Sequence, residues 1–382
     1  MANTDVDVVV IGLGAMGSMA LWRLASRGIN VMGIEQFEIA NDRGSSFGST
    51  RLFRLACFEH PDLGTMAVRA RDLWRELEDV SGAEILTQTG GVMIGPPSSE
   101  LIVGTRRAAA AAGSPVSELT WGELTERFPV HANVDTSHVG LWDASAGVVR
   151  PELGITSAVT AARSLGAEVL ENTRVTEISE TVDGVVVRTA DRVIRARSVV
   201  VATGPWISKL LHEDALVPMR TIMTWFQSSD GFLGTDKVPV FIRQIQDGRT
   251  FWGHGQVDGL PLKVGAPDDS VNLRPTDPDN VDRNVSSADL ASAHDVVSSY
   301  LSGIDPDPVK ARACLITFSP DHQFVLGPRE TGSRVILAGG CSGHAFKHAS
   351  AIGEFLAASA LGEPAGPEYA FVAASRFSRV AG

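Results

Sequence analysis

Short apolar runs near both ends and in the middle of the chain predict buried strands. Residues 8–11 and 31–34 form two such runs, and 198–202 and 335–338 form two more. A continuous apolar run of this length, bounded by turn residues, is typical of a strand buried on both faces of a parallel sheet. These four runs therefore predict the core of an α/β fold.

Apolar positions three or four residues apart predict the helices. Thr120 followed by Glu123 is the pattern of a capping box at a helix start. The predicted helices cover 18–26, 65–80, 101–112, 120–128, 151–165, 286–301 and 345–361. Other extended segments are predicted at 89–95, 168–170, 173–178, 184–188 and 192–196, with paired strands between 140 and 149.

The composition changes at about residue 218, where prolines and turn residues become more frequent. Extended apolar pieces at 238–242 and 250–252 lie among them, and 271–284 is rich in loop residues. This pattern indicates a second domain built on a mixed or antiparallel sheet. We expect a discontinuous nucleotide-binding domain and a substrate domain, the first over 1–88, 150–217 and 320–382 and the second over 89–149 and 218–319.

A glycine-rich turn follows the first apolar run. Gly12 permits a tight turn, Gly14 lets a pyrophosphate approach the backbone, and Gly17 lets the next helix lie close to the sheet. Glu35 ends the second apolar run. Its separation in sequence from the glycine turn is close to that of the carboxylate that binds the adenosine ribose in dinucleotide sites. The unit predicts a dinucleotide site, and the alternative is an ordinary strand-helix-strand unit with a glycine-rich turn.

Two further stretches of small residues support a long cofactor. The segment 44–51 reads as a loop, with Arg51 and Arg54 after it at helical spacing. The segment 339–343 follows a buried run and precedes a predicted helix. An anion site at each end of the chain suits a bipartite cofactor better than a single phosphate.

Charge and cysteine content exclude several classes of protein. The formal charge of −12 argues against nucleic-acid binding, which normally needs a basic face. Three cysteines without framework spacing indicate thiols in a reducing compartment. No signal peptide or membrane span is indicated, and Asp321 with His322 lacks the ligand spacing of a zinc site. We expect a cytoplasmic protein without a metal or a membrane partner, as a monomer or small homo-oligomer.

Five motifs follow one another along nearly the whole chain, at Gly12–Gly17, Gly44–Arg51, Leu262–Gly265, Ala311–Gly327 and Ser342–Lys347. In this order they resemble the flavin-dependent amine oxidases of the monomeric sarcosine oxidase and N-methyltryptophan oxidase family, which includes fructosyl amino acid oxidases. The resemblance implies the D-amino-acid-oxidase-like fold, a Rossmann-type FAD-binding domain with a substrate domain on a mixed or antiparallel sheet.

The resemblance also implies roles for individual residues. Cys314 matches the cysteine that binds FAD covalently, although a buried cysteine alone reads as a small hydrophobe. Lys263 matches the lysine that promotes the reaction with O2, and Arg54 with Lys347 matches the pair that binds a substrate carboxylate. Arg51 matches an arginine beside the flavin ring. The implied cofactor contacts are Gly12, Gly14, Ala15, Met16, Gly17, Glu35, Gln36, Arg43, Ser49, Thr50, Arg51, Val175, Ala202, Gly204, Trp206, Cys314, Gly340, Gly343, His344, Phe346 and Lys347.

Several positions depart from the sarcosine-acting relatives. Ser46 and Phe47 stand in place of a histidine, and Pro267 replaces another. Ile316 and Trp252 occupy positions where those relatives have tyrosine. The pocket is therefore expected to differ in polarity and shape, so the resemblance implies an N-substituted α-amino acid with an N-methyl or larger group, including a fructosyl group.

The implied reaction is oxidation of the C–N bond of a secondary amine to an imine, with O2 reduced to H2O2. His344 could serve as a base, but its place inside a turn favours a structural or flavin-contacting role. The alternatives are a flavin-dependent amino acid dehydrogenase, a primary-amine oxidase of the glycine or D-amino acid type, a nicotinamide-dependent reductase and a non-catalytic nucleotide-binding module. The reductase would leave Cys314 without a role.

Overall fold

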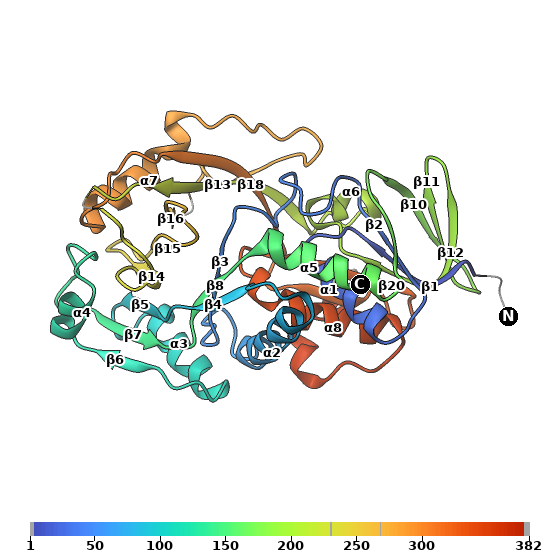
Figure 1. Cartoon of the computed structure of the whole chain (residues 1–382), viewed down its shortest axis with the longest axis horizontal. Helices are drawn as coiled ribbons and strands as arrows, with labels where there is room; N and C mark the ends of the chain where they lie inside the picture. Colours follow the sequence, from blue (N-terminus) through green and yellow to red (C-terminus); the bar gives the residue numbers. More distant parts are fainter. Residues whose placement is uncertain (1–3, 230, 268, 378–382) are drawn as a thin grey trace.

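The first apolar run forms the central strand of an eight-stranded sheet. In the computed structural model, which describes residues 4–229, 231–267 and 269–377, β1 pairs in parallel with β2 and β12. The sheet stands on the right of Figure 1. Its strands are β1 (Val6–Ile11), β2 (Val31–Ile34), β9 (Glu168–Leu170), β10 (Val175–Glu180), β11 (Val185–Thr189), β12 (Val193–Val201), β19 (Val325–Pro328) and β20 (Val335–Gly339).

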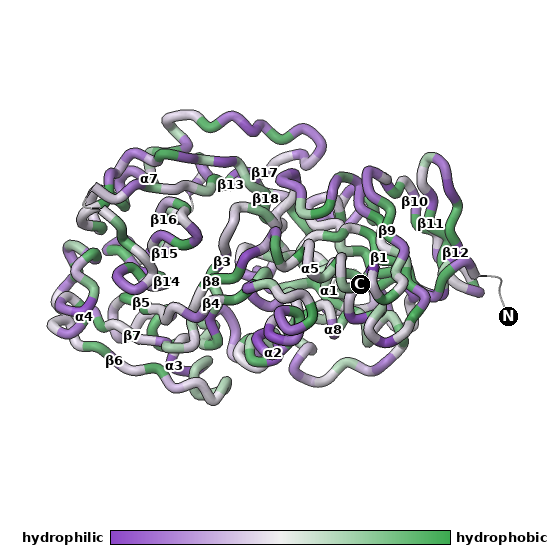
Figure 2. The backbone as a smooth tube through the Cα atoms, in the orientation of Figure 1, coloured by the Kyte–Doolittle hydropathy of each residue, from purple (hydrophilic) through white to green (hydrophobic). Residues whose placement is uncertain are grey.

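Helices pack against one face of this sheet. α1 (Ala15–Ser26) contacts both α5 (Pro151–Ser164) and α8 (Ala349–Ala360), and α2 (Leu63–Ser81) packs on α8. The contact of α8 with α1 needs a glycine, because a Cβ at Gly353 would lie 2.3 Å from the Cβ of Met19. Hydrophobic segments gather along α1 and the strands beside it in Figure 2.

The second sheet has nine strands and is mixed. β14 pairs in parallel with β5, while its other neighbour β15 runs antiparallel. This sheet lies on the left of Figure 1, beside α3 (Glu100–Ala111), α4 (Trp121–Arg127) and α7 (Ser287–Tyr300). Its strands are β5 (Gly91–Gly95), β6 (Ser117–Leu119), β7 (Val139–Asp143), β13 (Val217–Phe226), β14 (Val240–Gln244), β15 (Thr250–His254), β16 (Leu262–Gly265), β17 (Arg274–Pro275) and β18 (Lys310–Phe318).

A three-stranded sheet stands between the two large ones and corrects two predictions. β3 (Arg51–Phe53) and β4 (Leu86–Gln88) both pair with β8 (Gly147–Val149). The loop predicted over 44–51 therefore ends at Thr50, because Arg51 begins β3. The strands expected to pair between 140 and 149 do not pair with each other, because β7 joins β5 and β6 in the nine-stranded sheet.

Most other predicted elements are confirmed, with two changes. The segments 192–196 and 198–202 form one strand, β12, whose first half pairs with β11 and whose second half pairs with β20. The last helix, α8, begins only after a 3-10 turn at Phe346–His348. The Thr120–Glu123 capping box is present, and Ser286 caps α7 in the same way. The α/β fold class is confirmed, whereas the division into two domains stays a prediction.

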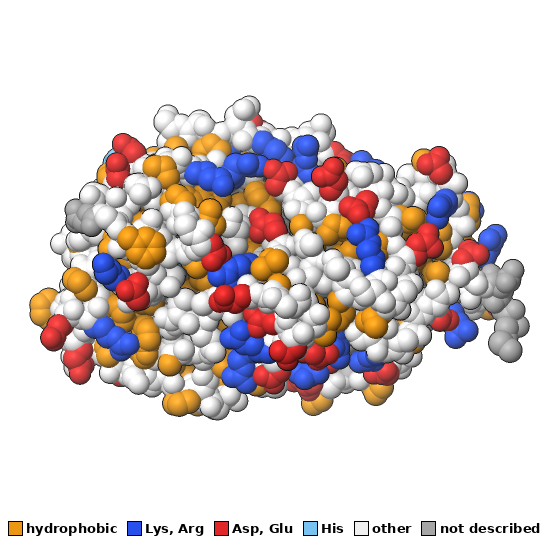
Figure 3. All heavy atoms as spheres, viewed as in Figure 1, with side chains coloured by type: hydrophobic (Ala, Val, Ile, Leu, Met, Phe, Trp, Pro, Cys, Tyr) orange, Lys and Arg blue, Asp and Glu red, His pale blue; other side chains and the backbone are white. Residues whose placement is uncertain are grey.

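The surface carries charges of both signs. On the face in Figure 3, Lys and Arg side chains alternate with Asp and Glu, without a continuous basic patch. Within the described ranges, no helix is both long enough and apolar enough to cross a membrane.

Candidate functional site

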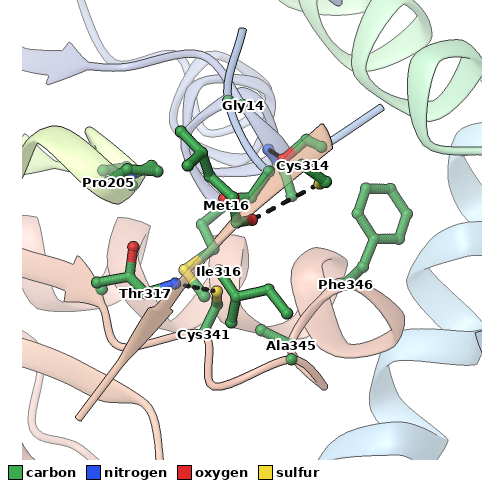
Figure 4. Close-up of a pocket in the computed structure, with 18 of the residues that line it drawn as sticks. Gly14, Met16, Pro205, Cys314, Ile316, Thr317, Cys341, Ala345 and Phe346 are labelled. Carbon is green, nitrogen blue, oxygen red and sulfur yellow. Dashed lines mark hydrogen bonds between the residues drawn. The ribbon is translucent and has the colours of Figure 1, made fainter. Parts of the chain in front are cut away.

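A cavity of about 970 Å³ extends from the glycine turn after β1 to the second sheet. Its walls come from segments far apart in the chain, including the turn at 12–16, the loop and strand at 44–54, strand β18 and the turn at 339–347. Figure 4 shows Gly14, Cys314 and Cys341 among the residues around it. The two turns of small residues therefore open into one space.

The first turn has the geometry that a phosphate needs. Gly12 has φ +85°, and a Cβ at Gly17 would lie 1.8 Å from the Gly12 carbonyl oxygen, so the helix start touches the turn. No side chain caps α1 at Gly14. Ser46 Oγ accepts a hydrogen bond from the Ala15 N–H at 3.1 Å. The helix N-terminus thus faces the cavity with little bulk in front of it.

Glu35 lies at the end of β2 and is buried against the same turn. Its Oε2 accepts a hydrogen bond from the Leu13 N–H at 2.8 Å, and its Oε1 accepts one from the Phe37 N–H at 3.1 Å. Burial raises the pKa of this carboxyl group. Glu35 therefore fixes the glycine turn as well as lining the cavity, a structural role that spacing did not reveal.

The second turn follows β20 and packs against β18. Gly340 and Gly343 have φ values of +61° and +85°, which favour glycine. The Ser342 N–H donates to the Thr317 carbonyl at 2.9 Å, so the turn is tied to the strand that carries Cys314. Cys314 is buried on the cavity wall, and burial raises the pKa of its thiol.

Arg54 and Lys347 lie together on the cavity wall and share a carboxylate that sequence analysis missed. Glu59 Oε1 lies 2.6 Å from Arg54 Nη2 and 3.3 Å from Lys347 Nζ. Burial alone would raise the pKa of Glu59, but the two cations hold it well below its usual value. Lys347 Nζ also donates to the His344 carbonyl at 3.0 Å. Two cations with one internal carboxylate leave one positive charge for a monoanionic ligand.

Lys263 lies behind the cavity wall rather than on it. Its side chain is buried in β16, and its Nζ donates to the carbonyl oxygens of Gly48 at 2.8 Å and Thr50 at 2.9 Å. It forms no ion pair with a carboxylate among the described residues, and burial lowers its pKa well below the usual value for lysine. Arg51 does line the cavity, and its Nη1 also donates to the Thr50 carbonyl at 2.9 Å.

The structure brings most of the predicted site residues to this cavity. Gly17, Arg43, Ser49, Thr50 and Lys263 are outside its lining. The predicted residues that line it are Gly12, Gly14, Ala15, Met16, Glu35, Gln36, Arg51, Arg54, Val175, Ala202, Gly204, Trp206, Cys314, Gly340, Gly343, His344, Phe346 and Lys347.

The departures from the sarcosine-acting relatives divide into two groups. Trp252 and Ile316 line the cavity, as does Ser46. Phe47 and Pro267 do not, and Phe47 is buried against Met223, Trp225 and Cys314. Trp252 lies so close to Gly265 that a Cβ there would be 2.1 Å from its ring. The pocket shape therefore depends on Trp252 and Ile316 directly.

Comparison with known proteins finds relatives that match nearly the whole chain. Monomeric sarcosine oxidase of Streptomyces avermitilis is 34% identical over 364 residues, which cover 93% of each chain. N-methyl-L-tryptophan oxidase of Yersinia pestis is 28% identical over 98% of this chain and all of that protein. In three dimensions the chain is similar to NikD, an amino acid oxidase of nikkomycin biosynthesis, with a TM-score of 0.84 at 24% identity over 96% of this chain and 97% of that one.

Fructosyl amine oxidase (amadoriase I) of Aspergillus fumigatus is similar in fold, with a TM-score of 0.77 at 18% identity over all of this chain and 92% of that one. The family model described as FAD dependent oxidoreductase matches residues 7–359. A match over nearly the whole chain, on a fold whose two glycine turns meet at one cavity, identifies the chain as a member of the FAD-dependent oxidoreductase family.

Proposed function

We propose that the protein oxidises the C–N bond of N-substituted α-amino acids and passes the electrons to O2. The observation that carries this proposal is the position of Arg54 and Lys347 on the wall of the cavity that also receives both glycine turns. A carboxylate bound to these two cations would hold an amino acid within the cofactor cavity. The names of the most similar curated relatives support an amine as the reacting group.

The cavity fits FAD. The open N-terminus of α1 and Gly12 would hold the pyrophosphate, Glu35 would bind the ribose, and the turn at 339–343 with Cys314 would hold the flavin end. When bound, FAD takes a hydride equivalent from the carbon next to the amine nitrogen and transfers the electrons to O2.

The chain itself orients the substrate through its charged side chains. Arg54 and Lys347 bind the carboxylate, which must displace part of their interaction with Glu59. His344 stays neutral at physiological pH, because burial lowers its pKa to about 4. No side-chain nucleophile is required, and the imine product hydrolyses in water.

The proposal is tested by mixing the flavin-containing protein with N-methyl, cyclic and fructosyl amino acids without oxygen, then with oxygen. We expect a secondary amino acid to bleach the visible absorbance, and oxygen to restore it with formation of H2O2. Bleaching without rapid peroxide formation would indicate a dehydrogenase. Release of ammonia from glycine or a D-amino acid would indicate a primary-amine oxidase, and reduction by a nicotinamide cofactor alone would contradict the proposal.

We further propose that Cys314 carries the flavin covalently. It lies on the cavity wall, and Arg51 and Lys263 nearby favour its thiolate while burial opposes it. After acid precipitation, yellow colour should remain in the pellet of the unchanged protein and move to the supernatant for Cys314→Ser. Cys341→Ser is the matched control, since Cys341 lines the same cavity, and it should retain the colour in the pellet. Colour in the supernatant of the unchanged protein would refute the covalent bond.

Replacing Glu59 with glutamine should strengthen the binding of carboxylate ligands. Arg54 and Lys347 would lose their internal counter-ion, so an external carboxylate would no longer compete with it. We expect the Kd of acetate, measured from the flavin spectrum, to fall about tenfold, which corresponds to about 1.4 kcal/mol. Acetamide, the uncharged control, should bind equally to both proteins. An unchanged Kd for acetate would exclude this competition.

The cytoplasmic location and the oligomeric state stay predictions.

A further inference from the structure

We propose that His254 is a positioning residue, which acts through Thr50 to hold the side chain of Arg51 on the wall of the cofactor cavity and that of Lys263 behind it. The inference rests on the proposed function, together with the role in the reaction with O2 that the family resemblance implies for Lys263. His254 lies in none of the motifs of the family resemblance. It does not line the cavity, so it can affect the cavity only through the groups that it contacts.

The hydrogen bonds of His254 define its tautomer. His254 is 2% exposed, and its Nδ1 lies 2.7 Å from the Gly255 carbonyl oxygen. A carbonyl oxygen only accepts, so Nδ1 carries the proton and Nε2 is the acceptor in the neutral ring. The Thr50 hydroxyl, 2.8 Å from Nε2, therefore donates to it. The ring thereby fixes the Thr50 side chain from a different sheet.

The Thr50 carbonyl oxygen accepts hydrogen bonds from both cationic side chains. Lys263 Nζ and Arg51 Nη1 each donate to it at 2.9 Å. Lys263 also lies directly beside His254, because the two residues form a pair between β15 and β16. Any rotation of the peptide after Thr50 would therefore move the acceptor of both cations at once.

The turn before Thr50 has a strained backbone that needs external support. Gly48 and Ser49 have φ values of +104° and +70°, and the second is unfavourable for a residue with a Cβ. Glu152 at the start of α5 accepts hydrogen bonds from the N–H groups of Gly48 at 2.6 Å and Ser49 at 3.1 Å. Glu152 thus holds the turn from its N–H side, and His254 holds it at Thr50.

Burial also keeps His254 uncharged. Its pKa falls to about 4 because of burial, with a further lowering by Lys263. At neutral pH the ring is therefore an acceptor for Thr50 and adds no positive charge beside the lysine.

The test uses the flavin-containing protein with His254→Leu and Thr50→Val. Each variant removes the hydrogen bond between the two side chains, and Thr50→Val keeps the backbone carbonyl. Protein reduced with dithionite is mixed with O2, and the midpoint potential of the flavin is measured separately. We expect both variants to react with O2 about tenfold more slowly, the loss of one well-placed hydrogen bond. We also expect both midpoint potentials to become more negative, since the cations are held less closely.

His131→Leu is the matched control. His131 is also a buried neutral histidine, but it packs on Phe241 in the second sheet, away from the turn. It should leave the oxygen rate and the midpoint potential unchanged. A His254→Gln variant, whose amide oxygen can accept from Thr50, should recover part of both losses.

Two outcomes would overturn the inference. One is that Thr50→Val leaves the oxygen rate and the midpoint potential unchanged. The other is that His254→Leu lowers the melting temperature but changes neither the oxygen rate nor the midpoint potential. Because dithionite replaces the amine, these results do not depend on the substrate. Failure of every amine to bleach the unchanged protein would count against the proposed function alone.

Discussion

Replacing Lys263 with methionine is expected to slow the reaction of the dithionite-reduced protein with O2 by about 100- to 1,000-fold. This is the usual cost of removing one fixed electrostatic donor from a site where charge develops. Lys263 is a fixed cation behind the cavity wall, because two carbonyl oxygens hold its ammonium and its side chain is 1% exposed. Reduction of the same variant by an amino acid substrate, measured without oxygen, should change much less.

The oxygen reaction should also depend on pH through Lys263. Burial lowers the pKa of this lysine well below its usual value of 10.5. The protonated form carries the charge, so the rate should fall as the pH rises through the lowered pKa, at a lower pH than for an exposed lysine. Lys263→Met should lose this pH dependence, and Lys263→Arg should keep the charge at high pH. Equal oxygen rates for the unchanged and methionine proteins would assign the oxygen reaction to other groups.

Local patterns in the chain were sufficient to predict the nucleotide-binding unit. In the turn at 12–17, Gly17 is needed because of its contact with Gly12, and capping boxes such as Thr120 with Glu123 span a single helical turn. Such features depend on residues close in sequence, so their spacing carries the information. The cofactor cavity could be predicted for the same reason, since each turn that lines it is a local motif.

The charged contacts around the site could not be predicted in this way. Thr50 and His254 are 204 positions apart, and Lys347 and Glu59 are 288 apart. No periodicity relates such residues, and only the tertiary fold, which places a loop beside a strand or a helical turn, brings them together.

Phe47 and Trp252 show why aligned positions alone do not define a pocket. Both stand where the sarcosine-acting relatives have other residues, yet only Trp252 lines the cavity. The side chain of Phe47 packs against Met223 and Trp225 in a buried cluster, and this packing supports the loop that carries Phe47. The direction of a side chain depends on the backbone of its loop, which residue identity does not specify.

Lowering the pH from about 6.5 to 4 should destabilise the folded protein strongly. Burial lowers the pKa values of His131 to about 3 and of His254 and His344 to about 4, and it lowers that of His348 well below 6.5. At pH values between these lowered pKa values and 6.5, the histidines of the unfolded chain bind protons that those of the folded chain do not. Stability must therefore fall as the pH falls through this window.

The expected slope is large because four groups act together. Each contributes up to about 1.4 kcal/mol per pH unit, so the free energy of unfolding should fall by roughly 5 kcal/mol per unit where all four differ. Urea unfolding of the flavin-containing protein at pH 7, 6 and 5 measures this slope.

His131→Leu should reduce this slope by about a quarter, since both ring nitrogens of His131 are buried without a hydrogen-bond partner among the described residues. A urea midpoint that stays constant between pH 7 and 5 would show that these histidines are protonated in the folded protein, and it would remove the basis for His254 as a neutral acceptor of the Thr50 hydroxyl.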